Sequence, residues 1–111
     1  MTRLASSLIV SALVRRVHDA GGSAMVLAKG DAMGGALLVL LLDRGADPRF
    51  VERGIGADGG IAMIAAGPPA ADSATATDYW RRRRARDPDL WVIEVDVPNG
   101  ERFAAETILS G

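Results

Sequence analysis

The stretch from Asp78 to Val97, DYWRRRRARDPDLWVIEVDV, decides the fold. It contains both tryptophans, the single tyrosine and five of the twelve arginines. Its first half predicts a helix that ends at Asp87-Pro88, because proline disfavours the α conformation in the residue before it. In its second half every second residue from Trp91 to Val97 is apolar, which is the period of a half-buried strand. We therefore expect the rest of the chain to pack around this helix-to-strand junction.

Three further strands are predicted before that junction, at Ser23 to Ala28, Ala36 to Leu42 and Ile61 to Ala66. The second of them, ALLVLLL, is continuously apolar, as expected of a strand covered on both faces, and we place it centrally in the sheet. The segment between the first two, Lys29 to Gly35, is rich in glycine and predicts a loop.

The segment from Leu4 to Ala20 is predicted to be a helix, because Ile9, Leu13 and Val17 recur on one face. Ser6 or Ser7 is expected to cap its start by accepting a bond from a free backbone N–H. The β-branched residues of this segment leave a strand from Leu8 to Val17 as the alternative.

Two segments carry weaker signals. Asp43 to Gly60 contains five glycines and one proline and is predicted to be the least regular part of the chain. After the break at Gly67-Pro68-Pro69, an exposed connection should run to Thr77 and lead into the arginine-rich helix, with Asp72, Ser73 or Thr75 as its cap.

The end of the chain predicts a hairpin. Asn99-Gly100 is the favoured pair for a two-residue type I′ turn. A return strand should then start at Arg102 and continue to about Ala105, where Glu106 would fall on the apolar face. Together these elements predict an α+β fold: a mainly antiparallel sheet of about four to five strands packed with two helices, in a single domain over residues 1–111.

Composition excludes several kinds of chemistry. The chain has no cysteine, which removes thiolate metal sites and cysteine nucleophiles, and fits a reducing compartment. His18 is the only histidine and is expected to be an exposed helix residue. With a net charge of −1 and no apolar run of about 18 residues, a cytoplasmic protein is expected, with no membrane contact, metal or cofactor.

Three patterns together resemble a small bacterial family. They are VSALVRR at 10–16, KGD at 29–31 followed by GALLV, and YWRRRRARDPDLWVIEVD at 79–96. The family is a domain of unknown function, number 1491, and the resemblance covers nearly the whole chain. It implies a stand-alone bacterial protein and carries no assigned activity, cofactor or partner.

The candidate functional surface is the arginine-rich helix. Tyr, Trp and Arg are the residue types enriched at interface hot spots, so Tyr79, Trp80, Arg81 and Arg84 are the candidate partner-binding residues, with Arg15 and Arg16 on the first helix. Four consecutive arginines spread around a helix and make no single stripe. Asp78 should pair with Arg82 at i, i+4, and Arg84 should stack on Trp80.

No catalytic motif is present. Asp87 and Asp89 flank Pro88 and are interpreted as a helix stop and turn, since a hard cation needs more oxygen ligands. Neither glycine-rich segment matches a phosphate-binding motif. We expect a non-catalytic interaction or accessory module that binds a protein partner or forms a homodimer. The alternative is an enzyme or small-ligand-binding domain whose site comes from residues distant in sequence; nucleic-acid binding is less favoured.

Overall fold

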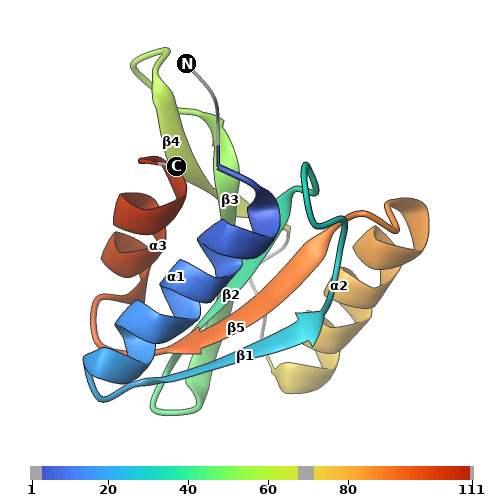
Figure 1. Cartoon of the computed structure of the whole chain (residues 1–111). Coiled ribbons are helices and arrows are strands. Elements are labelled where there is room, and N and C mark those ends of the chain that lie inside the picture. The colour runs from blue at the N-terminus through green and yellow to red at the C-terminus, as the bar shows by residue number, and fades with distance from the viewer. Residues whose placement is uncertain (1–3, 68–71, 111) are drawn as a thin grey trace.

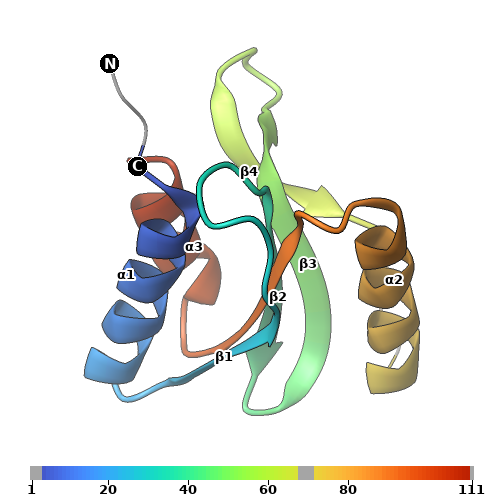
Figure 2. The same cartoon turned by 45° about the vertical axis from the view of Figure 1, so that its right-hand side comes forward.

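A computed structural model describes residues 4–67 and 72–110 and shows a five-stranded sheet between two layers of helix (Figures 1 and 2). The helices α1 and α3 cover one face of the sheet and α2 covers the other (Figure 2). In chain order the elements are α1 (Ser6–Asp19), β1 (Ser23–Ala28), β2 (Leu37–Asp43), β3 (Ala46–Ile55), β4 (Ile61–Ala66), α2 (Ser73–Arg86), β5 (Trp91–Asp96) and α3 (Gly100–Ile108).

The strand order is β1-β5-β2-β3-β4, so β5 lies between two strands that are consecutive in sequence. β5 pairs antiparallel with β1 and parallel with β2, while β2, β3 and β4 form an antiparallel meander. The α+β class, the mainly antiparallel sheet and the central position of the ALLVLLL strand are thereby confirmed. β1 and β2, however, are not neighbours.

The central strands β2 and β5 divide their side chains between two cores. Val39, Ile93 and Val95 lie on the α1–α3 side, and Leu38 and Val92 lie on the α2 side. Because both faces are covered, β2 is apolar from Leu37 to Leu42 where a half-exposed strand would alternate, whereas β5 keeps Glu94 on the α2 side. Trp91 is 4% exposed and belongs to the first core, as its position in the alternating strand predicted.

The first helix is confirmed, and the alternative strand from Leu8 to Val17 is not formed. The predicted serine cap is wrong. Ala5 occupies the N-cap position, and the free N–H groups of Ser6 and Ser7 donate to the backbone carbonyls of Met33 and Ala32 at 3.1 and 2.9 Å. The Ser6 hydroxyl accepts no bond from the helix backbone and instead donates to the Gly35 carbonyl at 2.6 Å. The 29–35 loop therefore caps α1 through its backbone.

The segment from Asp43 to Gly60 is more regular than predicted. It contains β3, a ten-residue strand that pairs with β2 on one side and β4 on the other. Asp47 lies inside it at φ 53, and Gly54 has no room for a Cβ beside Ile64. Asp47 and Gly54 thus lie inside a strand, and the other glycines of the segment lie in the turns beside it, which is why composition alone suggested a loop.

The predicted hairpin at Asn99-Gly100 is wrong, and the return strand from Arg102 to Ala105 does not exist. Asn99 does take the left-handed conformation, at φ 59, but as the residue before a third helix, α3. The buried positions of α3, Gly100, Ala104, Thr107 and Ile108, have the spacing of a helix stripe. Glu106 is exposed on the helix, which removes the conflict that a return strand would have created.

The second helix has one of the predicted caps and the predicted C-terminal end, but Ser73 to Thr77, predicted as an exposed connection, already belong to it. Asp72 is its N-cap, and its carboxylate accepts from the Thr75 backbone N–H at 2.8 Å. The helix ends at Arg86, before Asp87-Pro88. The predicted break at Pro68 and Pro69 lies outside the described residues, as does part of the connection to Thr77.

Candidate functional site

The arginine-rich helix α2 divides its side chains between the protein and the solvent. Ala76 is buried, and Tyr79, Trp80, Arg83 and Arg84 are half-buried at i+3, i+4, i+7 and i+8 from it. This is the stripe of an amphipathic helix, although two of its positions are arginines. The remaining arginines, Arg81, Arg82 and Arg86, are exposed. The arginine run is therefore neither a solvated face nor a single basic patch.

Arg83 fastens α2 to the sheet. Its two terminal nitrogens donate to the two carboxylate oxygens of Glu52 on β3 at 3.0 and 2.9 Å, and Nη1 also lies 2.9 Å from the Tyr79 hydroxyl. The hydrogen bonds with Glu52 raise the pKa of the Arg83 guanidinium further above its usual value. Tyr79 in turn packs against Phe50 of β3, with ring centroids 4.9 Å apart. Tyr79 and Arg83 thus fix the position of the helix.

The predicted stacking of Arg84 on Trp80 is wrong. The Nη2 atom of Arg84 donates to the Lys29 carbonyl at 2.9 Å, which ties the end of α2 to the 29–35 loop. The guanidinium that lies over Trp80 is that of Arg81, whose Cζ is 5.6 Å from the ring centroid. Within residues 4–67 and 72–110, no ion pair joins Asp78 to Arg82. Of the predicted candidates on α2, Tyr79 and Arg84 therefore serve the fold.

The helix-to-strand junction and the 29–35 loop form one backbone unit. Asp31 N–H donates to the Asp89 carbonyl at 3.0 Å, and the Trp91 indole Nε1 donates to the Asp31 carbonyl at 2.7 Å. A Cβ on Gly30 or Gly35 would overlap the Asp89 carbonyl oxygen. The Asp87 carboxylate accepts from the Asp89 N–H at 3.1 Å. Asp87 and Asp89 are therefore parts of a turn, as their spacing around Pro88 indicated.

A groove of about 750 Å³ lies between α2 and the sheet; we call it the α2 groove. Its apolar wall consists of Leu27 of β1 and Leu40 and Leu42 of β2, the two strands on either side of β5. Trp80 and Arg81 line it from the helix, together with Asp72, Ser73, Ala76 and Thr77; Gly45, Ala46, Asp47 and Pro48 of the β2–β3 hairpin and Glu94 of β5 complete the lining. The groove thus brings two of the predicted residues, Trp80 and Arg81, to one surface.

The charged residues of the α2 groove are predominantly acidic. Among the described residues that line the groove, Arg81 is the single cation, against the carboxylates of Asp47, Asp72 and Glu94. The Thr75 backbone N–H that Asp72 caps lowers the pKa of that carboxyl, so Asp72 stays ionised at neutral pH. This balance disfavours a polyphosphate or a nucleic-acid backbone as the occupant.

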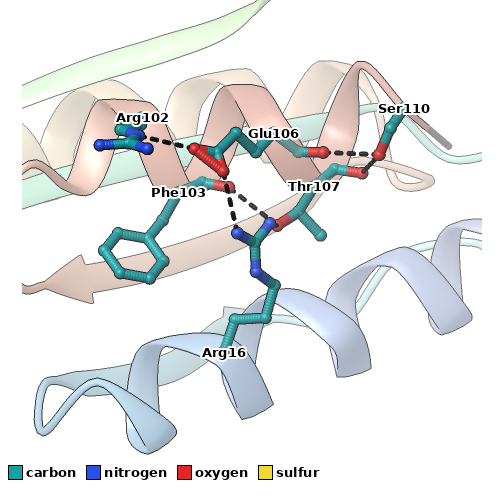
Figure 3. A network of polar contacts seen from close by, with 6 residues as sticks. All are labelled: Arg16, Arg102, Phe103, Glu106, Thr107 and Ser110. Atoms are coloured by element: carbon teal, nitrogen blue, oxygen red, sulfur yellow. Dashed lines mark hydrogen bonds and ion pairs between the residues drawn. The ribbon is translucent and has the colours of Figure 1, made fainter.

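The two candidates on α1 do different things. Arg16 donates to Thr107 at 2.8 Å and to Glu106 at 3.1 Å, and Glu106 also accepts from Arg102 at 2.7 Å (Figure 3). These bonds, first that from Arg102 and then that from Arg16, lower the pKa of the Glu106 carboxyl. Arg16 therefore holds α1 to α3, whereas Arg15 is exposed on the other flank of α1, next to β1.

Within residues 4–67 and 72–110, no cluster of three or more His, Asp or Glu side chains is arranged to hold a metal ion. His18 is exposed, as predicted. Each helix of the described ranges is too short or too polar to cross a lipid bilayer.

Sequence reasoning missed the sheet side of the groove. Leu27, Leu40, Leu42 and Glu94 come from strands that were predicted, but no motif associated with binding or catalysis includes them. A signal did exist: every second residue of ALLVLLL must point away from the α1 side, so a continuously apolar strand requires a second covering layer. The α2 groove itself could not be located from the sequence, because its position depends on the order of the strands in the sheet.

The chain folds as a five-stranded α+β sheet between two layers of helix, and the comparisons give its family. The chain belongs to the family described as "Protein of unknown function (DUF1491)", whose sequence profile matches residues 4–105. The resemblance of the three sequence patterns is thereby confirmed. No match was found among curated proteins.

Solved structures of relatives agree with the fold. A crystal structure of a DUF1491 family protein from Caulobacter crescentus is 31% identical, with a TM-score of 0.78 over 91% of this chain and 94% of that one. An NMR structure of a DUF1491 family protein from the same organism has a TM-score of 0.75 at 31% identity, covering 93% and 94%. A solution structure of a protein from A. tumefaciens has a TM-score of 0.67 at 29% identity, covering 86% and 87%.

Proposed function

We propose that this protein is a non-catalytic interaction module of the bacterial cytoplasm, which binds a segment of a protein partner in the α2 groove. The observation that carries the proposal is the position of Trp80 and Arg81 on the wall of the α2 groove, opposite Leu27, Leu40 and Leu42. An aromatic ring and a guanidinium next to apolar side chains are the composition of an interface hot spot.

The groove is built to be rigid before a partner arrives. The bidentate Arg83–Glu52 pair and the Tyr79–Phe50 contact hold α2 on the sheet, and Asp72 caps the end of the helix that lines the groove. A preformed site loses little conformational entropy on binding. The absence of cysteine supports the cytoplasmic location, because it fits a reducing compartment.

Selection of binders from a phage-displayed library of random short peptides tests this proposal. Peptides rich in apolar residues should be enriched, with dissociation constants tighter than about 100 μM. Trp80→Ala and Arg81→Ala should each weaken binding of the selected peptides by at least about tenfold, since hot-spot truncations cost about 2 kcal/mol or more.

Arg82→Ala is the matched control. Arg82 is the neighbouring residue of the same type, is exposed, and lies outside the groove lining. Far-ultraviolet circular dichroism should show that all three variants keep the fold. Peptides that bind equally well to the wild type and to Trp80→Ala would exclude the groove as the binding site. Micromolar binding of DNA or RNA at about 150 mM salt, with the steep salt dependence of phosphate contacts, would replace the proposal with a nucleic-acid function.

A further inference from the structure

β1 is an edge strand whose outer side has no partner strand within the described residues. It stands first in the order β1-β5-β2-β3-β4 and pairs with β5 alone. The outward backbone N–H and C=O groups of such a strand are a template for pairing with another chain. Natural proteins usually protect such edges with charged side chains, proline or a bulge.

The sequence of β1, SAMVLA, has neither a charge nor a proline. Its irregularity lies between Val26 and Ala28, at the end of the strand, and leaves Ser23 to Val26 regular. Met25 and Val26 in the middle are 58% and 38% exposed. They are consecutive residues, so they point to opposite faces of the sheet, and the edge is apolar above and below.

The other edge strand, β4, differs from β1 at its centre. Ala62, Met63 and Ile64 are half-buried there, and Met63 packs against the first core. Its large exposed apolar side chain, Ile61, stands at the first position, 53% exposed. Pairing at mid-strand would therefore bury more apolar surface on β1 than on β4.

The helix beside β1 continues the apolar surface. A shallow hollow of about 520 Å³ between α1 and β1 is lined by Val10, Ser11, Val14, Arg15, His18, Asp19 and Val26. Arg15 and Asp19 give it one positive and one negative charge. A surface with both signs is compatible with a copy of itself, because a two-fold axis brings the cation of one copy towards the anion of the other.

We propose that β1 pairs antiparallel with β1 of a second copy of this chain, so that one sheet runs through both protomers. Side chains directly opposite each other in such a pair lie on the same face of the sheet. A two-fold axis must therefore pass through a matched pair, either Met25 opposite Met25 or Val26 opposite Val26. This arrangement puts both α1 helices on the same side of the shared sheet. The inference is independent of the α2 groove.

Light scattering after size exclusion tests the proposal on the full chain. The mass should be about twice the 11.6 kDa of one chain. Met25→Lys and Val26→Lys should shift the protein to the monomer, with at least a tenfold weaker dimer, because a charge on an edge strand blocks pairing. Met33→Lys is the matched control: Met33 is 73% exposed but belongs to the 29–35 loop. It should leave the dimer unchanged.

A second measurement does not depend on those variants folding. The chain has no cysteine, so Met25→Cys, Val26→Cys and Met33→Cys each introduce a single thiol. On oxidation at least one of the two β1 variants should form a covalent dimer at a tenfold or greater excess over Met33→Cys. A wild-type monomer at about 100 μM, a dimer insensitive to both lysine substitutions, or equal cross-linking at residue 33 would each overturn the proposal.

Discussion

Removal of the Arg83–Glu52 pair should measure how firmly α2 is held on the sheet. We consider Arg83→Met, Glu52→Leu and the double variant. Arg83→Met leaves the Glu52 carboxylate half-buried without its two donors, and Glu52→Leu leaves the guanidinium with the Tyr79 hydroxyl alone. The double variant leaves two apolar side chains that can pack together.

The expected size follows from geometry and exposure. The pair is bidentate, at 3.0 and 2.9 Å, which is the strong arrangement for arginine and carboxylate. Its side chains are 30% and 27% exposed, so solvent screens part of the interaction. Exposed pairs contribute about 0.2–1 kcal/mol, whereas removal of one partner from a buried pair costs about 3–5 kcal/mol. Between these limits we expect a coupling of about 1–2 kcal/mol, a sizeable part of a total of about 5–15 kcal/mol.

Urea unfolding followed by circular dichroism gives the four free energies of the cycle. All variants should be compared at one protein concentration, because self-association would add to the apparent stability. Arg82→Met, on the exposed side of the same turn, should change stability by less than about 0.5 kcal/mol. A coupling below about 0.5 kcal/mol, or an equal loss in Arg82→Met, would show that apolar contacts alone hold α2.

Three further predictions concern the cores, the 29–35 loop and the α1–α3 contact. Trp91→Ala should lose about 3–5 kcal/mol in denaturant unfolding because a fully packed indole is removed, and Trp80→Ala clearly less, because Trp80 is half-buried; an equal loss would contradict the burial. Gly35→Ala should lose more than about 2 kcal/mol by steric overlap with the Asp89 carbonyl, whereas Gly34→Ala, whose added Cβ would have its nearest neighbour at 3.9 Å, should stay within about 0.5 kcal/mol. The folded-state pKa of Glu106 is lowered, so the ionised carboxylate stabilises the fold above its unfolded-state pKa. This stabilisation disappears as the pH falls through the folded-state pKa. Unfolding free energies of wild type and Glu106→Gln should therefore differ at neutral pH and converge in acid; a constant difference would assign the loss to packing.

The sequence predicted those features of the fold that residues close together in the chain determine. Asp72 as a cap and Pro88 as a stop bracket α2 because capping and proline act within a few residues. The apolar alternation of Trp91 to Val97 identified β5 and its buried face for the same reason. The positions of the candidate partner-binding residues were harder to predict. Trp80 and Arg81 line the α2 groove, whereas Tyr79, Arg84 and Arg16 make hydrogen bonds to other parts of the same chain.

The failures have a common cause, which is that tertiary contacts decided the outcome. Asn99 adopts the same left-handed conformation in a hairpin turn as it does before α3. What favours the helix is the packing of Ala104 and Ile108 against α1 and the sheet. The cap of α1 likewise comes from the backbone of a loop, which no side-chain rule can predict. Arg83 finds Glu52 across 31 positions, beyond the reach of helix spacing rules.

The insertion of β5 between β1 and β2 has a consequence for the order of folding. Leu37 pairs with Trp91 and Ser23 with Asp96, so the centre of the sheet joins the two ends of the chain. Contacts so distant in sequence form slowly, because the loop closure they require has a large entropy cost. During synthesis β1 and β2 leave the ribosome well before β5. Until then the apolar strand Leu37 to Leu42 has one of its two neighbours missing. The nascent chain is therefore most exposed to aggregation in this interval, which ends when β5 has been synthesised and pairs with β2.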